Sequence, residues 1–263
     1  MGATIAVLSQ KGGTGKTTSV RTLGDVFRRI GLDVLAVDLD PQGNLSDYFD
    51  VDPEAAPTIS DVFAGRAEAA AAVRDGIIPA NLSLAEAELS LVGKMGRELT
   101  LKRALEPIAD DYDLLLLDCP PTLGLLTVNG LVAADHALLT TEAQYFALQG
   151  VEQALEVIEL ARDGLNPKLG WLGVIFNIAD MRTRHSRDAY ETLREHVGEK
   201  LFAATVRQSI AYAESAELAI SILDHRPDLA ADYLAVADEL LTRLKMTELR
   251  PRLQQLTETM AKR

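Results

Sequence analysis

The residues best suited to chemistry form a glycine-rich string three residues after an apolar run at residues 4–8, namely Gly12, Gly13, Thr14, Gly15, Lys16 and Thr17. Glycines let backbone N–H groups converge on phosphate oxygens, and a following helix adds partial positive charge. Lys16 can reach the β- and γ-phosphates, and the Thr17 hydroxyl can bind Mg²⁺. The string predicts a phosphate-binding loop. The competing interpretation is a tight strand-to-helix turn with a solvated lysine.

Acidic residues follow two further apolar runs. Asp118 ends the run at 114–117, where a carboxylate can accept hydrogen bonds from water molecules on Mg²⁺. Asp38 and Asp40 follow the run at 34–37, and they point to the same side if the strand continues through them. Either aspartate could instead cap the loop before Pro41.

Short apolar runs bounded by glycine, proline or polar residues must position these groups. They predict buried strands at 4–8, 34–37, 114–117, 137–140 and 171–176. Helical spacing predicts helices at 16–30, 58–64, 98–109, 145–163, 186–197 and 228–245, with Gly31 ending the first and an alanine-rich surface helix at 67–73. This alternation predicts an α/β fold, a doubly wound, mostly parallel sheet with helices on both faces. We expect a single domain over residues 1–263, with a basic C-terminal tail helix at 247–263.

Composition excludes several classes of protein. The 263 residues are 48% hydrophobic and 25% charged, with no apolar run of about 18 residues, so fibrous, disordered and membrane-spanning chains are excluded. The first residues carry no basic segment typical of a secretory signal, so we expect a cytoplasmic protein. Cys119 is the only cysteine and cannot form an intrachain disulfide. The net charge of −13 means that any nucleic-acid surface must be a local basic patch.

A second lysine, Lys11, stands immediately before Gly12. The segment QKGGTGKTT at 10–18 resembles the deviant Walker A motif of the ParA/Soj/MinD family of P-loop NTPases. The resemblance continues through VDLDPQGN at 37–44, LLDCPPTLGLLTVN at 116–129, AAD at 133–135, FALQG at 146–150 and DMRT at 180–183. It implies a Mg²⁺-dependent ATPase that forms a homodimer when ATP is bound. Two triphosphates facing each other would repel, and a lysine from each subunit can offset that charge.

The resemblance also implies roles for individual residues. Lys11 would reach the partner's nucleotide, although it could be an ordinary surface lysine at the mouth of the loop. Lys11, Lys16 and Asp40 would be catalytic, with Asp40 orienting the attacking water. Thr17, Asp38 and Asp118 would surround the metal. The nucleotide would contact Lys11, Gly12, Gly13, Thr14, Gly15, Lys16, Thr17, Thr18, Asn177 and Arg207.

Recognition of the base centres on NIAD at 177–180. This segment resembles the guanine-reading Asn-Lys-x-Asp pattern, but Ile178 replaces the lysine, which weakens a GTP interpretation. In the resembling ATPases this position lies against adenine, so Asn177 is the candidate for base recognition through its amide. Alternatively, Asn177 caps a loop. Soj-like relatives carry an Ile-Pro-Arg-Asn-Val-Arg segment where this chain reads TVRQSI, which keeps Arg207 and has Ile210 in place of the second arginine.

In the ParA/Soj branch the ATP-bound dimer binds DNA without sequence preference, and a ParB-like partner stimulates hydrolysis. The resemblance therefore implies chromosome or plasmid segregation or cargo positioning, with nucleoid association in the ATP-bound state. An acidic body suits a partner with a basic segment. Six basic residues could contact phosphates, or could be a solvated face paired with acidic neighbours: Arg182, Arg184, Arg187, Arg194, Lys200 and Arg207.

The alternative function is a MinD-like or cargo-positioning switch that acts on a membrane or a protein scaffold. Leu249, Leu253, Leu256 and Met260 repeat at three- and four-residue spacing among basic residues, as in an interfacial helix. Pro251 interrupts this segment and no large aromatic residue anchors it, so packing on the protein body is favoured. We do not expect membrane contact.

Overall fold

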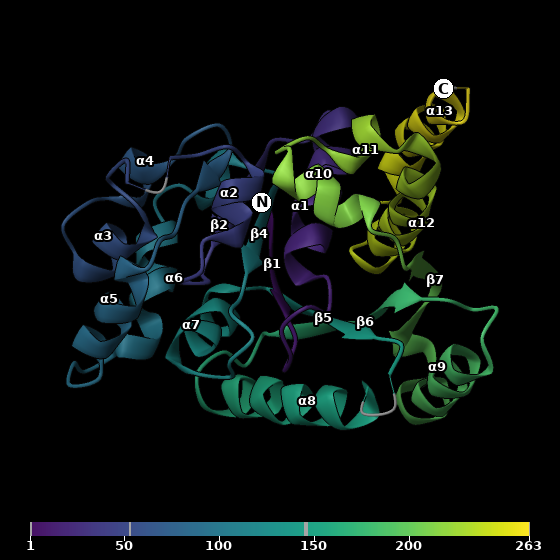
Figure 1. The fold of residues 1–263 in the computed structure, drawn as a ribbon. Helices are drawn as coiled ribbons and strands as arrows, with labels where there is room; N and C mark the ends of the chain where they lie inside the picture. Colours follow the sequence, from purple (N-terminus) through teal and green to yellow (C-terminus); the bar gives the residue numbers. More distant parts are fainter. Residues whose placement is uncertain (1, 53, 145–146, 263) are drawn as a thin grey trace.

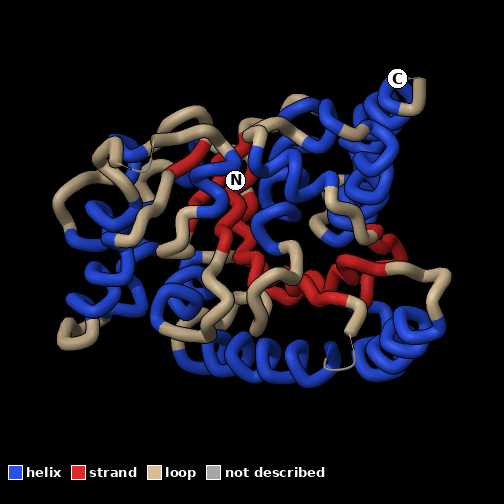
Figure 2. Tube along the Cα trace, in the orientation of Figure 1, coloured by secondary structure: helices blue, strands red, loops and turns tan. Residues whose placement is uncertain are grey.

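The computed structural model describes residues 2–52, 54–144 and 147–262. Within them a single sheet lies at the centre of the molecule (Figure 2), with strands in the order β3-β2-β4-β1-β5-β6-β7 and every neighbouring pair parallel. The strands are β1 (Ala3–Leu8), β2 (Val34–Asp38), β3 (Ile77–Ile78), β4 (Leu114–Asp118), β5 (His136–Glu142), β6 (Gly170–Ala179) and β7 (Leu201–Arg207).

Successive residues of the central strands enter two separate cores. In β1, Ile5 and Val7 join one apolar cluster, whereas Ala6 and Leu8 join the other. Because side chains alternate along a strand, both faces of the sheet must be covered by helices. The predicted doubly wound fold is confirmed.

The helices divide between the two faces (Figure 1). Those on the face of Ile5 are α1 (Lys16–Arg29), α2 (Asn44–Tyr48), α10 (Ala211–Glu217), α11 (Ile222–His225), α12 (Pro227–Arg243) and α13 (Arg250–Met260). The helices that contribute to the other core are α3 (Ile59–Ala64), α4 (Ala69–Ala72), α5 (Ser83–Leu91), α6 (Thr100–Leu105), α7 (Leu125–Ala133), α8 (Ala147–Gly164) and α9 (Arg184–Val197).

All five predicted strands are present, and most predicted helices end within two residues of the expected position. The first ends at Arg29, and Gly31 follows its C-cap with a φ of 92° that only glycine adopts easily, while Leu32 N donates to Phe27 O at 3.1 Å. The predicted end of the helix at 98–109 is wrong. The helix stops at Leu105 because Pro107 lacks an N–H and clashes with the preceding turn.

Other differences are of extent or burial. Residues 145 and 146, which begin the helix expected at 145–163, lie outside the described residues. The alanine-rich helix is only four residues long, and it lies at the surface with Ala70 and Ala71 exposed while Ala69 and Ala72 contribute to the core. The sequence patterns did not predict β3, β7, α2, α5, α7, α10 or α11.

The basic tail packs on the body of the protein. Leu253 and Met260 of α13 are buried in the same core as α12, and Pro251 lies in the first turn, where a missing N–H costs nothing. Arg250 donates two hydrogen bonds of 2.6 Å to Asp238 on α12. Among the described helices, none combines the length and apolarity needed to span a bilayer.

Candidate nucleotide-binding site

The glycine-rich loop connects the carboxyl end of β1 to the start of α1. Gly12 and Gly13 are exposed, Thr14 is buried, and Thr17 and Thr18 lie in the first turn of the helix. Gly15 precedes α1 with a φ of 81°, and a Cβ there would lie 2.7 Å from Asn177 Nδ2. A side chain at Gly15 would therefore strain the backbone and also displace Asn177.

Lys16 lies inside the loop. Its side chain is buried, with the residue only 6% exposed, and Nζ donates to Ser9 Oγ at 3.1 Å and to Lys11 O at 3.3 Å. Burial lowers the pKa of Lys16, while the charges of Asp118 and Asp40 act in the opposite direction. A buried ammonium bonded to two neutral oxygens, at a helix N-terminus, is suited to bind a phosphate anion.

Asp118 and Thr17 form the part of the site that fits Mg²⁺. Thr17 Oγ1 donates to Asp118 Oδ2 at 2.7 Å, whereas the buried Asp118 Oδ1 has no hydrogen-bond partner among the described residues. Burial and, to a smaller extent, the charge of the nearby Asp38 raise the pKa of Asp118 to about 8. No group of three or more His, Cys, Asp or Glu side chains in the described chain could hold a metal by itself. Nucleotide oxygens and water would complete the Mg²⁺ shell, as this ion prefers.

Asp38 lies beside Asp118 on the neighbouring strand, but its oxygens are already bonded. Oδ2 accepts from Ser46 N at 3.0 Å and from Ser46 Oγ at 2.7 Å, and Oδ1 accepts from Asp40 N at 3.0 Å. Burial raises the pKa of Asp38 to about 6. In this structure Asp38 links the loop that contains Asp40 to the first turn of α2. The contact of Asp38 with the metal remains a prediction.

Asp40 lies on the rim of the site. Its Oδ1 accepts from Gln42 N at 3.0 Å, a contact typical of a capping aspartate. The same carboxylate is close enough to Lys16 to affect its pKa. The capping interpretation of Asp40 is thus observed, and its role in orienting the attacking water remains a prediction.

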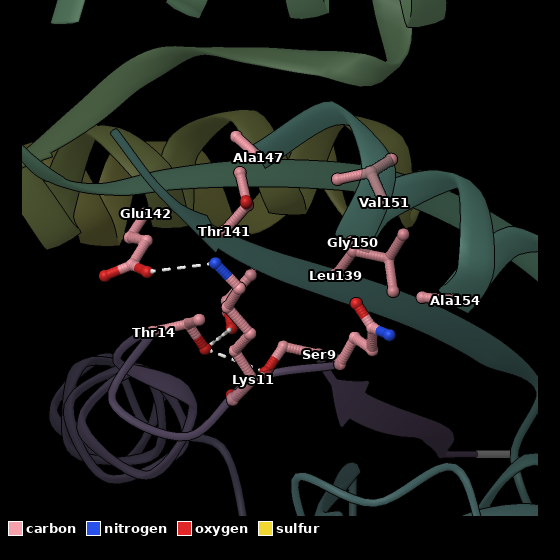
Figure 3. Close-up of a pocket in the computed structure, with 12 residues that line it drawn as sticks. Ser9, Lys11, Thr14, Leu139, Thr141, Glu142, Ala147, Gly150, Val151 and Ala154 are labelled. Carbon is pink, nitrogen blue, oxygen red and sulfur yellow. Dashed lines mark hydrogen bonds and ion pairs between the residues drawn. The ribbon is translucent and has the colours of Figure 1, made fainter. Parts of the chain in front are cut away.

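Lys11 lies at the mouth of the loop and points toward the end of β5 (Figure 3). Its side chain is 41% exposed, and Nζ lies 3.9 Å from Glu142 Oε1, whose side chain is 17% exposed. Ser9, Thr14 and Val151 line the same small pocket. The two lysines are therefore arranged differently, since Lys16 lies inside the phosphate loop and Lys11 lies at its outer edge.

Asn177 lies under the loop at the carboxyl end of β6. Its buried Nδ2 donates to Thr14 O at 2.9 Å and to Ser19 Oγ at 3.3 Å, while Oδ1 has no partner among the described residues. The donors of the amide thus stabilise the loop, as the loop-capping interpretation predicts. The acceptor remains available to an amino group such as that of adenine.

The six basic candidates do not form one patch. Arg182, Arg184 and Arg187 surround the start of α9 at the carboxyl edge of the sheet. Arg194 lies near the other end of α9. This helix has 14 residues and is therefore about 20 Å long. Lys200 Nζ donates to Trp171 O at the amino edge, 2.6 Å away.

Most of the arginines at the carboxyl edge have acidic partners. Arg182 donates to both oxygens of Asp180 at 2.8 and 3.0 Å, and Arg184 pairs with Asp188 at 3.3 Å. Arg187 instead donates to the carbonyl oxygens of residues 181 and 182. Arg207, at the end of β7, bonds to Asp232 at 2.8 and 3.0 Å, and this bond raises its pKa.

Comparison with known proteins supports the resemblance. A family model described as an AAA domain matches residues 2–171. The chromosome-partitioning ATPase Soj of Treponema pallidum is 35% identical over 92% of this chain and 98% of its own. The chain belongs to the Soj/ParA family of P-loop ATPases. Another relative of this family, the chromosome partitioning protein ParA of Caulobacter vibrioides, is 34% identical over 91% of this chain and 94% of its own.

Solved structures show the same fold as this Soj/ParA chain. A crystal structure named cobyrinic acid a,c-diamide synthase from Mycobacterium smegmatis, with bound ADP and magnesium, superimposes with a TM-score of 0.81. It is 36% identical and covers 93% of this chain and 96% of its own.

Three residues of the site were missed from the sequence. Ser9 accepts from Lys16, Ser46 bonds to Asp38, and Glu142 pairs with Lys11. Ser9 and Glu142 end or follow apolar strands, the same signal that identified Asp118. Ser46 lies eight residues from Asp38 in a short helix and has no such signal.

Proposed function

We propose that this chain is an ATPase that dimerises when it binds ATP and Mg²⁺ and returns to the monomer after hydrolysis. The observation that carries the proposal is the contrast between the two lysines of the loop. Lys16 is 6% exposed and directed inward, whereas the side chain of Lys11 is 41% exposed at the outer rim. A cation at the rim can contact a nucleotide held by a second subunit, which Lys16 cannot.

The chain's own residues would divide the chemistry as follows. Lys16 and the backbone of Gly13 to Thr17 bind the phosphates, and Thr17 and Asp118 hold Mg²⁺. When bound, Mg²⁺ neutralises charge on the phosphates. Asp40 orients the attacking water, and Lys11 of each subunit stabilises charge at the other nucleotide. Positioning and electrostatics suffice, so no covalent nucleophile is required.

As the output of this cycle we propose binding of DNA without sequence preference, with hydrolysis stimulated by a ParB-like partner; relatives named for chromosome partitioning support it. Arg182, Arg184, Arg187 and Arg207 share the carboxyl edge of the sheet with the loop. Three of them pair with aspartates, so phosphates would have to replace those aspartates. Dimerisation would double the number of contacts and make the affinity steeply dependent on salt. Segregation of a chromosome or plasmid, and nucleoid association, would follow.

A specific observation favours a second output, the positioning of a protein cargo. Ile210 occupies the place of the second arginine of Soj-like relatives, and it is 76% exposed. This exchange removes a positive charge from the carboxyl edge. A membrane output is less favoured, because Leu253 and Met260 of the tail are buried against the body.

Light scattering with a non-hydrolysable ATP analogue and Mg²⁺ tests the dimer. Wild-type protein should double in mass, Lys11→Ala should remain monomeric while still binding the analogue, and the exposed Lys168→Ala should behave as wild type. Asp40→Ala should bind ATP and remain dimeric, because hydrolysis is lost. A wild-type monomer at saturating analogue would refute the proposal.

Measurements of DNA binding and of ATP turnover distinguish the two outputs. The protein should bind linear DNA only when ATP is present, and its affinity for DNA should fall as salt rises. The name of the M. smegmatis neighbour describes an amide-forming enzyme, and in a chain with that activity cobyrinic acid would stimulate turnover of ATP. We expect no such stimulation. Absence of DNA affinity at low salt would favour a protein cargo.

A further inference from the structure

The outward face of α10 combines exposed apolar and acidic side chains. Ile210 is 76% exposed, Leu218 is 57% exposed, and Ile220 is 43% exposed. Ile210, Glu214 and Leu218 are four residues apart and therefore lie on one side of the helix, with Glu217 beside them. The opposite side, with Ala211 and Ser215, is buried. We refer to Ile210, Glu214, Glu217, Leu218 and Ile220 as the α10 face.

The charge of the α10 face is negative. Glu214 and Glu217 are both exposed, and Oε2 of Glu214 lies 3.5 Å from Nε2 of His225. Basic residues flank the face on either side, but each is neutralised locally. Arg207 is bonded to Asp232, and Arg226 donates to both oxygens of Asp228 at 2.9 Å.

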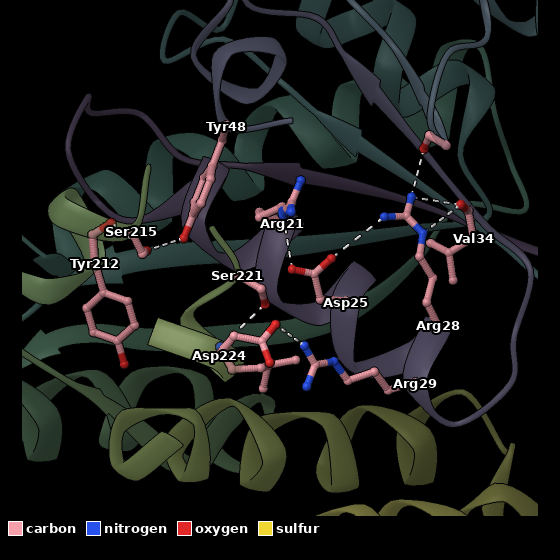
Figure 4. Close-up of polar contacts among 12 residues, drawn as sticks. Arg21, Asp25, Arg28, Arg29, Val34, Tyr48, Tyr212, Ser215, Ser221 and Asp224 are labelled. Carbon is pink, nitrogen blue, oxygen red and sulfur yellow. Dashed lines mark hydrogen bonds and ion pairs between the residues drawn. The ribbon is translucent and has the colours of Figure 1, made fainter. Parts of the chain in front are cut away.

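The buried side of α10 contacts α2, the helix that follows the loop carrying Asp40. Ser215 Oγ forms a hydrogen bond with the hydroxyl of Tyr48 at the end of α2 (Figure 4). The same short helix contains Ser46, which holds Asp38 and, through it, the backbone of Asp40. A molecule on the α10 face would therefore lie one helix away from the loop that carries Asp40.

A second set of contacts leads from the same region to the phosphate loop. Tyr212 of α10 packs edge-on against Tyr233 of α12, with ring centroids 5.9 Å apart. Tyr233 Oη lies 3.1 Å from Ser19 Oγ, which also accepts from Asn177 Nδ2. α10 is thus attached to both sides of the nucleotide site.

We propose that the α10 face is the docking site for a basic amphipathic segment of a partner protein. The proposal rests on the proposed function, since it names the surface through which a partner would reach the ATPase. Apolar side chains of the segment would cover Ile210 and Leu218, and its lysines or arginines would contact Glu214 and Glu217. Nucleic acid is excluded as the occupant by like charge, and two copies of this face would repel each other if they met directly.

Fluorescence anisotropy with a defined probe tests the docking site. The probe is a labelled peptide of about 18 leucines and lysines in helical spacing, and the comparison peptide has glutamate for every lysine. Helix α8 offers a matched control surface, because Glu156, Glu159 and Leu160 are also exposed. The measurements are made at about 0.15 M salt, where distant charges are screened.

The lysine peptide should bind at least roughly tenfold more tightly than the glutamate peptide. Glu214→Lys/Glu217→Lys and, separately, Ile210→Ser/Leu218→Ser should each weaken binding by about tenfold. The control variants Glu156→Lys/Glu159→Lys and Leu160→Ser should change binding by less than about twofold. Equal losses on α8 and α10 would overturn the proposal.

Two further measurements on the same preparations complete the test. Each variant should bind the ATP analogue with Mg²⁺ as wild type does. If nucleotide binding is intact but the affinity for the lysine peptide does not change with the α10 substitutions, the docking site alone is refuted. Failure of wild-type protein to bind the analogue or to dimerise refutes the proposed function instead. If the α10 variants prevent the ATP-dependent dimer, the face is a contact between two copies and the docking proposal is wrong.

Discussion

The ion pair between Lys11 and Glu142 should oppose dimerisation. Lys11 must leave Glu142 of its own subunit before it can contact a nucleotide in the other subunit. Glu142→Gln keeps the size and polarity of the side chain but removes its charge. We therefore expect the variant to form the ATP-bound dimer more tightly than wild-type protein, with unchanged affinity of the monomer for nucleotide.

The expected magnitude follows from the geometry. At 3.9 Å two unit charges attract by about 1 kcal/mol in bulk water and about 4 kcal/mol at an effective dielectric constant of about 20. Because both side chains are partly exposed, the pair should contribute about 0.5 to 1 kcal/mol after screening. A dimer breaks two such pairs, so the total is about 1 to 2 kcal/mol. This corresponds to a dimer dissociation constant lowered by roughly 5- to 30-fold.

Sedimentation velocity over a range of protein concentrations, with the ATP analogue and Mg²⁺, measures this constant. Glu106→Gln is the matched control, since it removes the same charge from an exposed position at the end of α6. The difference between the two variants should shrink as salt rises to about 1 M. A Glu142→Gln dimer no tighter than that of the control would refute the reasoning, and a weaker dimer would show that Glu142 assists Lys11.

Three further predictions concern binding, pH and stability. Lys16→Ala should abolish nucleotide binding in calorimetry without loss of the fold, because it removes the buried ammonium of the loop. Burial holds the pKa of Asp118 at about 8, so without Mg²⁺ the folded protein retains a proton that the unfolded chain releases above a pH of about 4. Stability should therefore fall as the pH rises from about 4 to about 8, and Asp118→Asn should flatten this slope in thermal denaturation. Leu253→Ala should lower the free energy of unfolding in urea by about 2 to 5 kcal/mol, whereas exposed Gln255→Ala should change it by less than about 0.5 kcal/mol.

Apolar runs predicted the centre of the fold because its strands are buried on both faces. β7 was missed because it lies at the edge of the sheet, where polar residues are tolerated, and Thr205 and Arg207 interrupt its apolar run. α7 was missed for the opposite reason. It is buried on most sides, from Leu126 to Val132, and therefore has no polar stripe to mark a helical period.

The site was partly predictable because its polar residues follow strands. Residues such as Asp118 and Asn177 meet at one edge of a parallel sheet. What could not be predicted are contacts between distant segments, such as Asn177 with Thr14 and Glu142 with Lys11, because spacing along the chain carries no information about them. Basic residues close in sequence were separated by the length of a helix, as Arg184 and Arg194 are.

The neutral partners of Lys16 have a practical consequence at the bench. Ser9 Oγ and Lys11 O are neutral acceptors, and the charges of Asp118 and Asp40 act on this ammonium without a direct ion pair among the described residues. A small tetrahedral anion would satisfy it almost as well as the end of a triphosphate does. Protein purified in phosphate or sulfate buffer should therefore melt at a higher temperature and gain little more from added nucleotide. Ligand screens based on melting temperature should use chloride or acetate salts.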